Sequence, residues 1–156
     1  MGDNKIPDRE EQNNAGEEPE FESLYSRVQN MSISEKVKLA SLGNKEARNL
    51  LIKEPNRLII QAVLNSPKLT DDEVAAFAGN KNLSKEVPLV IANKKEFTKN
   101  YMVKVALVNN PKTPLQSAIK FLSHLMDRDL RNVSKSKNVP TVISRTAAKM
   151  LVNKGR

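Results

Sequence analysis

Short apolar runs alternate with polar junctions along most of this chain, from about residue 32 to residue 154. The junctions contain residues whose side-chain oxygens can accept hydrogen bonds from the free amides of a helix's first turn. Successive residues of this kind are separated by 14 positions, or once by 15: Asn56, Thr70, Ser84, Thr98, Thr113, Asp127 and Thr141. This spacing predicts helices of about ten residues joined by turns of about four.

The junction at residues 107–115 shows the pattern most fully. Asn110-Pro111 ends one apolar run, and Thr113-Pro114 begins the next. Parts of this junction recur at a shift of 44 residues: LNSPK at 64–68 matches VNNPK at 108–112, and the LVN of 107–109 returns at 151–153. A unit of about 43 residues that holds three helices has the period of helical solenoid repeats.

Further helix signals occur at particular positions. Ser32 and Glu35 have the spacing of a capping box, and Gly43 is expected to end the helix that they begin. Thr70 and Glu73 have the same spacing. These pairs predict helix starts independently of the repeat.

The apolar positions of each run fall on one side of a helix, which is expected to face neighbouring helices. Small residues such as Ala62, Ala78 and Ala106 let helices approach closely, and helices this short need such contacts to be stable. The run at 87–91 resembles a strand, but Pro88 within it favours a buried helix. The expected buried stripes are Leu58-Ile59-Ala62-Val63, Val74-Phe77-Ala78, Met102-Val105-Ala106, Leu115-Ala118-Ile119-Leu122 and Ile143-Thr146-Ala147-Met150.

Charge divides the chain into two parts. Residues 1–30 carry eight acidic and three basic side chains, a net charge of −5, so residues 31–156 carry +13 within the formal total of +8. The expected organisation is an acidic N-terminal segment at 1–30 followed by a basic helical repeat domain at 31–156. An alternative is that Met31 is the true start and the acidic segment is an extension.

The acidic segment is predicted to be largely disordered. Between Ile6 and Phe21 its only apolar residue is Ala15. Nothing there offsets the entropy lost on ordering. Residues 21–29, in contrast, have the apolar spacing of one helix face and can form a short docking helix.

Residues suited to catalysis or metal binding are scarce. The chain has no cysteine, and its single histidine, His124, is more simply explained as a surface residue than as a catalytic one. The acidic cluster of Asp71, Asp72 and Glu73 lies in a first helical turn, where the helix dipole favours it without a metal. The glycines are isolated and form no phosphate-binding loop. We therefore predict no catalytic, cofactor-binding or metal-binding residues and no enzymatic activity.

Basic residues are the strongest lead to function. Arg128, Arg131 and Lys135 share one side of an expected helix whose only apolar residues are Leu130 and Val133. Basic faces are often only solvated surface, and that interpretation stays open beside a binding role. The predicted basic binding surface comprises Lys95, Lys99, Arg128, Arg131, Lys135, Lys137, Arg145 and Lys149.

Over roughly residues 32–154, these short capped helices resemble the α-solenoid class. HEAT and armadillo repeats are the most similar in period and helix count, and leucine-rich-repeat variants are a looser match. The resemblance implies an all-α fold, a right-handed α-solenoid of about eight or nine helices. It also implies an extended concave surface for proteins, peptides or nucleic acid, and no catalytic residues.

The expected function is therefore that of a non-enzymatic adaptor or scaffold. It would bind a protein with an acidic segment, or the chain's own acidic segment in competition, along the basic surface. The alternative is sequence-nonspecific DNA or RNA binding through the same surface, which ranks second because few aromatic residues are available to stack on bases. No apolar run is long enough to span a membrane and no signal peptide is evident, so cytoplasmic localisation is expected. The sequence indicates no oligomeric state.

Overall fold

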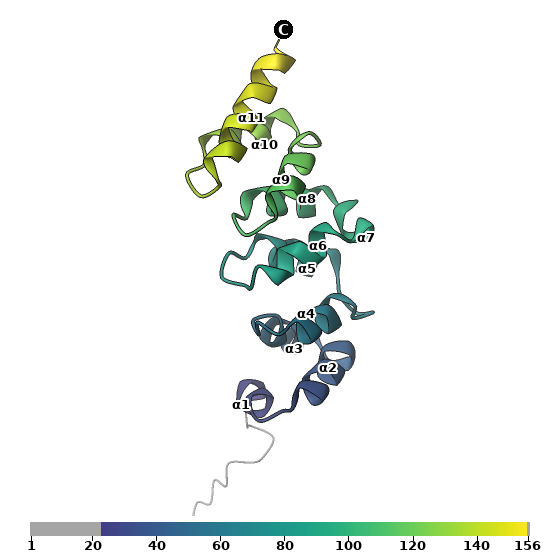
Figure 1. Ribbon diagram of the computed structural model, residues 1–156. Coiled ribbons are helices and arrows are strands. Elements are labelled where there is room, and N and C mark those ends of the chain that lie inside the picture. The colour runs from purple at the N-terminus through teal and green to yellow at the C-terminus, as the bar shows by residue number, and fades with distance from the viewer. Residues whose placement is uncertain (1–22, 156) are drawn as a thin grey trace, which may run out of the picture. The chain divides into compact units, whose positions relative to one another are not determined.

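In the computed structural model, which describes residues 23–155, the secondary structure is entirely helical (Figure 1). These residues form eleven helices and no strand, which confirms the predicted all-α fold. The predicted disorder of the N-terminal segment falls mostly on residues outside this range. The helices are α1 (Leu24–Gln29), α2 (Ile33–Leu42), α3 (Lys45–Leu51), α4 (Arg57–Leu64), α5 (Asp71–Gly79), α6 (Glu86–Ala92), α7 (Lys95–Thr98), α8 (Tyr101–Asn109), α9 (Leu115–Leu122), α10 (Asp127–Lys135) and α11 (Thr141–Lys154).

The described residues divide into two units, one that ends at Met31 and one that begins at Ser32. In the first unit, α1 lies within the predicted short helix at 21–29. It begins after Ser23, whose hydroxyl accepts a hydrogen bond from the Ser26 amide at 3.2 Å. This bond satisfies one of the free donors of the first turn. The second unit contains α2 to α11.

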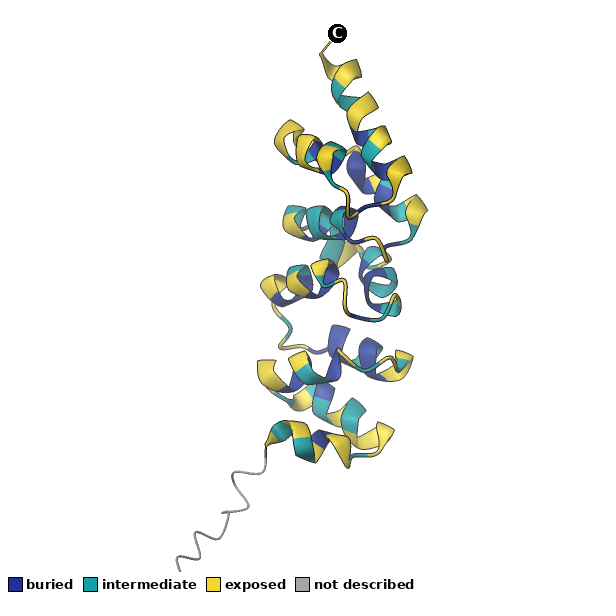
Figure 2. Cartoon of the chain, turned by 90° about the vertical axis from the view of Figure 1, so that its left-hand side faces the viewer, coloured by how far each residue is buried: buried dark blue, intermediate teal, exposed yellow. Residues whose placement is uncertain are grey.

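Helices of the second unit pack against helices close to them in the chain. The most extensive pairings join α10 with α11, α2 with α4, and α5 with α8. Between these pairs, α6 packs against α4 and α5, while α9 packs against α8 and α11. Figure 2 shows buried positions on the inner sides of these helices and exposed positions on their outer sides. Each short helix therefore depends on its neighbours for stability.

The helix starts follow the predicted caps at some junctions and depart from them at others. Asn56 and Thr70 cap α4 and α5 as predicted. Thr98 does not cap a helix, because it is the last residue of α7, a single turn that the spacing did not predict. The next helix, α8, begins after Asn100, whose side chain accepts a hydrogen bond from the Met102 amide at 2.9 Å. This extra turn brings the second unit to ten helices, so the predicted total of eight or nine is too low.

At the other four junctions of the series, the N-cap lies one residue from the predicted position. At two of them the cap is a proline, Pro114 before α9 and Pro140 before α11. The fixed φ of proline suits the extended conformation at the start of a helix, where an amide donor is not needed. Proline therefore displaces the neighbouring threonines, Thr113 and Thr141, from the cap.

Three residues in the predicted buried stripes are exposed: Leu58, Met102 and Leu115. In α8 the buried side chains are instead Val103, Leu107 and Val108. The sequence of this helix, YMVKVALVN, is apolar nearly all round, so its pattern does not define the side that faces the other helices. The run at 87–91 lies in α6, with Val87, Pro88 and Ile91 buried, as expected for a buried helix.

The junction at 107–115 is anchored by a buried asparagine. Asn110 is 2% exposed, and its Nδ2 donates a hydrogen bond to the Ala78 carbonyl of α5 at 2.8 Å. Its Oδ1 accepts a hydrogen bond from the Lys112 amide at 3.0 Å. One side chain thus shapes the turn and joins it to α5.

The two lysines that the 44-residue shift relates each bond a main-chain carbonyl, at positions that the shift does not relate. The Nζ of Lys112 donates to the Leu83 carbonyl at 2.8 Å. Its counterpart 44 residues earlier, Lys68, donates to the Leu42 carbonyl at 3.4 Å. At both junctions, a lysine of the later turn bonds the main chain of an earlier segment.

We expect Asn110→Ala to lower the free energy of unfolding by about 1–3 kcal/mol, because it leaves the buried Ala78 carbonyl and the Lys112 amide without partners. Urea unfolding followed by circular dichroism measures the change. The matched control is Asn109→Ala, since the Asn109 side chain bonds only the Val105 carbonyl of its own helix. Equal losses in the two variants would contradict this role of Asn110.

Candidate binding surface and a buried charged network

The basic residues of α10 lie on its solvent-facing side. Leu130 is 0% exposed and Val133 is 0% exposed, so these two residues fix the inner side of the helix. Arg128, Arg131 and Lys135 lie on the opposite side, as the helical period requires, and all three are exposed. The helix thereby presents three cations in a row.

A tyrosine of α8 holds the start of α10. The Tyr101 hydroxyl accepts a hydrogen bond from the Met126 amide at 3.0 Å and donates one to the Asp129 carboxylate. Met126, the N-cap residue, has no side-chain oxygen of its own to offer. Burial and the hydrogen bond to Asp129 raise the pKa of Tyr101, so the hydroxyl stays protonated and remains a donor. These contacts fix the end of α10 from which the basic row begins.

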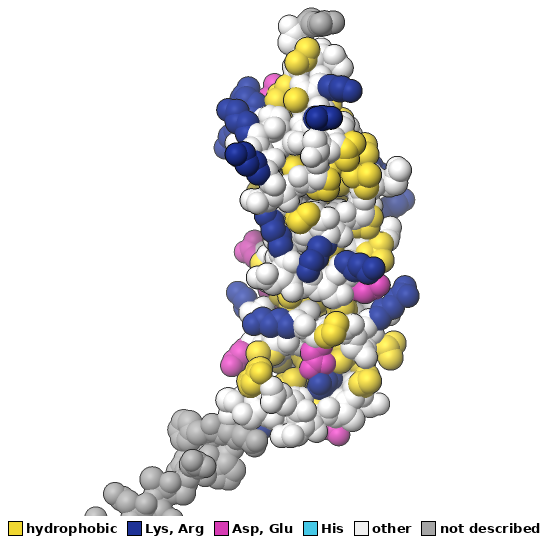
Figure 3. All heavy atoms as spheres, turned by 60° about the vertical axis from the view of Figure 1, so that its left-hand side comes forward, with side chains coloured by type: hydrophobic (Ala, Val, Ile, Leu, Met, Phe, Trp, Pro, Cys, Tyr) yellow, Lys and Arg dark blue, Asp and Glu magenta, His cyan; other side chains and the backbone are white. Residues whose placement is uncertain are grey.

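The predicted surface residues lie in two separate places. Six belong to the α10 and α11 pair: Arg128, Arg131 and Lys135 on α10, Lys137 in the following turn, and Arg145 and Lys149 on α11, all of them exposed. Figure 3 shows the densest group of basic side chains at the upper left, at the level of these two helices, with others spread singly over the face. Lys95 and Lys99 instead lie in and just after α7, on the opposite side from the α10–α11 turn in Figure 1.

Few carboxylates neutralise the α10 and α11 pair. Residues 127–154 contain seven basic and two acidic side chains, a net charge of +5. Of the two acids, Asp127 lies 3.1 Å from the Lys154 ammonium, while Asp129 bonds Tyr101 and lies 3.9 Å from the Arg128 guanidinium. Within residues 23–155 no carboxylate lies at ion-pair distance from the remaining five: Arg131, Lys135, Lys137, Arg145 and Lys149. These cations are open to an anionic partner.

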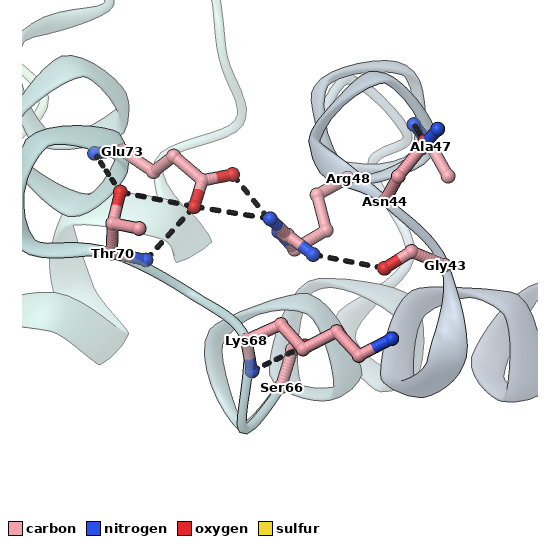
Figure 4. Close-up of polar contacts among 8 residues, drawn as sticks. All are labelled: Gly43, Asn44, Ala47, Arg48, Ser66, Lys68, Thr70 and Glu73. Atoms are coloured by element: carbon pink, nitrogen blue, oxygen red, sulfur yellow. Dashed lines mark hydrogen bonds and ion pairs between the residues drawn. The ribbon is translucent and has the colours of Figure 1, made fainter.

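The second charged constellation is buried. Figure 4 shows Arg48 of α3 reaching between Glu73 of α5 and the carbonyl of Gly43. Its Nε donates to Glu73 Oε1 at 2.9 Å, its Nη2 to Oε2 at 3.2 Å, and its Nη1 to the Gly43 carbonyl at 2.9 Å. The Arg48 and Glu73 side chains are 5% and 2% exposed. The pair therefore joins three elements: the end of α2, α3 and the start of α5.

Glu73 also completes the capping box predicted with Thr70. Its Oε2 accepts hydrogen bonds from the Thr70 amide at 2.8 Å and the Thr70 hydroxyl at 3.1 Å. Burial by itself raises the pKa of Glu73, but the bonds from Arg48 and Thr70 outweigh it and hold the pKa below its ordinary value. The carboxylate is ionised and fully engaged at neutral pH. We assign the network a structural role, because it leaves no polar atom of Glu73 free for a ligand.

The sequence predicted the capping box but not its buried partner. Arg48 lies 25 residues before Glu73, and nothing around it in the run KEARNLL distinguishes it from an exposed helical arginine. The burial of Arg48 follows only from the packing of α3.

Neither the histidine nor the acidic cluster of α5 is part of a metal-binding group in residues 23–155. His124 is exposed and meets the Phe121 ring edge-on, with 6.3 Å between ring centroids. Asp71 and Asp72 are exposed, whereas Glu73 turns inward to Arg48. In the part of the chain that the structure describes, no group of three or more His, Cys, Asp or Glu side chains could hold a metal ion. None of the helices in residues 23–155 combines the length and the apolar character that crossing a membrane requires.

No protein-family model, no curated protein and no solved structure matches the sequence.

Proposed function

We propose that this protein is a non-enzymatic interaction module of the α-solenoid class, a cytoplasmic adaptor or scaffold. Two observations support the solenoid. The extensive helix pairings in the second unit all join elements close together in the chain, as in repeat proteins whose units contact only their neighbours. Lys68 and Lys112, which are 44 residues apart, also each bond a main-chain carbonyl of an earlier segment.

The proposed partner is a protein with an acidic segment, bound along α10 and the adjoining part of α11. The observation that carries this proposal is the exposed basic row of α10, of which Arg131 and Lys135 have no carboxylate at ion-pair distance in the described chain. A positive surface speeds the approach of an acidic partner. Lys95 and Lys99 are not part of this surface.

Nucleic-acid binding is the second candidate, because the same cations could contact phosphates. Its weakness is the shortage of aromatic side chains for stacking on bases. Phe77 and Phe121 are buried, and the Tyr101 hydroxyl is engaged by Asp129. A binder of single strands ordinarily needs such rings at its surface, which makes an acidic protein segment the better match.

Charge reversal on α10 tests the proposal. We expect the double variant Arg131→Glu, Lys135→Glu to bind a fluorescent Glu-rich peptide at least about tenfold more weakly than the unchanged chain, because two attractive contacts become repulsive. Fluorescence anisotropy at low and moderate salt measures the affinity.

The matched control is Lys38→Glu, Lys81→Glu, which changes the net charge equally at exposed lysines of α2 and of the turn after α5. Equal weakening by both double variants would mean attraction by net charge alone and would contradict a surface on α10. Labelled DNA and RNA are titrated in parallel. Tighter binding of either than of the peptide, with a steep loss as salt rises, would favour the nucleic-acid alternative.

A further inference from the structure

Two exposed methionines lie where α8 and α10 begin. Met102 is the second residue of α8 and is 60% exposed. Met126 is the N-cap residue of α10 and is 62% exposed. Tyr101 joins the two segments, since it directly precedes Met102 and its hydroxyl accepts a hydrogen bond from the Met126 amide at 3.0 Å. Two large apolar side chains are therefore exposed on segments that a single tyrosine links.

The corresponding junction 44 residues earlier, between α4 and α6, serves as a comparison. There the second residue of α4, Leu58, is 61% exposed. The guanidinium of its neighbour Arg57 lies 3.9 Å from the Glu86 carboxylate at the start of α6. The N-cap residue of α6 is Lys85, however, whereas that of α10 is Met126. The two junctions thus share one exposed apolar side chain, and the second is particular to the start of α10.

The methionines lie at one end of the basic row. Arg128, whose side chain is 80% exposed, follows Met126 by two residues, and the row continues along α10 to Lys135. The two carboxylates in the first turn of α10 are already engaged within the fold, by Lys154 and Tyr101. An occupant with apolar side chains on the methionines and carboxylates along the row would complement both parts of this surface.

We propose that Met102 and Met126 form an apolar anchor point for the acidic partner segment, which carries large apolar residues at one end of its acidic run. The apolar residues pack on the methionines, whose unbranched side chains adapt to different shapes. The acidic run follows α10 from Arg128 to Lys135, about 10 Å along the helix, which three or four residues of an extended chain cover. This inference rests on the proposed function and specifies the sequence pattern of the partner.

Peptides with and without an apolar end provide the probe. The leucine peptide carries two leucines beside four glutamates, and the serine peptide carries two serines in their place. Each is made with these residues at the amino end and at the carboxyl end, because side-chain contacts allow either chain direction. Anisotropy titrations with the full chain at low salt are expected to show, in one direction, at least about tenfold tighter binding of the leucine peptide.

Substitution of the anchor point tests where this advantage arises. We expect the double variant Met102→Gln, Met126→Gln to bring the leucine peptide to within about twofold of the serine peptide, because it removes the apolar contact. The affinity of the serine peptide should not change. The matched control is Leu58→Gln, a similarly exposed position whose amide bonds its N-cap asparagine at 2.9 Å, as the Met102 amide does. This control should keep the leucine advantage.

Methyl NMR of the chain labelled with ¹³C-methyl methionine gives a direct readout. The sequence has five methionines, so the signals can be assigned by substituting them one at a time. The leucine peptide should shift the methyl signals of Met102 and Met126 and leave that of Met150, a half-buried residue of α11, in place. Unchanged signals for both Met102 and Met126 at saturating peptide would contradict the anchor point.

Further outcomes separate this inference from the proposed function. Equal affinities of the leucine and serine peptides, or loss of the leucine advantage in Leu58→Gln, would overturn the anchor point alone, provided that Arg131→Glu, Lys135→Glu weakens both peptides. If that charge reversal has no effect, the surface on α10 fails, and if no peptide binds, both proposals fail. Sedimentation velocity tests a second copy as the occupant: self-association that Met102→Gln, Met126→Gln abolishes would replace the partner with another copy of this chain.

Discussion

Replacing Arg48 by methionine is expected to lower the free energy of unfolding by about 3–5 kcal/mol, the usual cost of breaking a buried ion pair from one side. The Glu73 carboxylate, 2% exposed, would keep its bonds from Thr70 but lose the cation that offsets its burial. The Gly43 carbonyl would lose its donor as well. Urea unfolding at neutral pH, followed by circular dichroism, measures the loss.

The matched control is Arg57→Met. Arg57 lies 3.9 Å from Glu86, but its side chain is 69% exposed, so this variant should cost no more than about 1 kcal/mol. The double variant Arg48→Met, Glu73→Met, together with the two single variants, completes a double-mutant cycle. The double variant removes both buried charges and leaves neither unpaired. Its loss of stability should therefore be smaller than the sum of the losses in the two single variants. A small effect of Arg48→Met, or additive losses in the double variant, would contradict a coupled pair.

The Arg48–Glu73 network also predicts how the stability of the fold depends on pH. Since the pKa of Glu73 is lower in the folded state than its ordinary value, its contribution to stability is present above the pKa of an unfolded glutamate. The contribution is lost as the pH falls through the folded-state pKa. The free energies of unfolding of the unchanged chain and of Glu73→Gln should therefore differ at neutral pH and become equal in acid. Because the other carboxylates titrate in both proteins, the difference between the two free energies isolates Glu73.

Gly43→Ala is the second substitution with a large expected effect, a loss of about 1–3 kcal/mol from overpacking. A Cβ at this position would lie 2.6 Å from the Leu39 carbonyl oxygen and 2.8 Å from the Ala47 Cβ. Gly43 has φ −75° and ψ 173°, which any residue adopts, so the constraint is space rather than conformation. Thermal and urea unfolding of the variant measure the loss.

Gly79→Ala is the matched control. A Cβ there would meet only the Ala106 Cβ, at 3.5 Å, an ordinary contact. Because Gly79 lies at the end of a helix, alanine should be neutral or stabilising by up to about 1 kcal/mol. If both variants lose stability equally, the cost comes from replacing glycine in general and not from the close approach of α2 and α3 at Gly43.

The substitutions that test stability lie away from those that test binding. Gly43, Arg48 and Glu73 belong to the junctions of α2, α3 and α5, whereas the proposed surfaces are on α8, α10 and α11. We therefore expect Arg48→Met to unfold the chain more easily while leaving peptide affinity unchanged under conditions where the variant is folded.

Local interactions made part of the fold predictable. The caps at Asn56 and Thr70 were identified correctly, because a cap joins a side chain to an amide only two or three residues away. Thr98 was misassigned because competing polar residues follow it, and Asn100 caps α8 instead. The exposure of the basic row of α10 could also be predicted, since only two apolar residues define the inner side of that helix.

The sequence by itself determined that residues 23–155 are helical, where most of their helices begin to within one residue, and which cations share the exposed side of α10. The tertiary structure alone decided the contacts between distant residues: Arg48 with Glu73, 25 residues apart, and Asn110 with Ala78, 32 residues apart. It also separated Lys95 and Lys99 from the α10 and α11 pair, and left Val152 exposed where Val108 is covered. The physical reason is that helix caps and periodicity act within a few residues, whereas burial depends on which helices pack together.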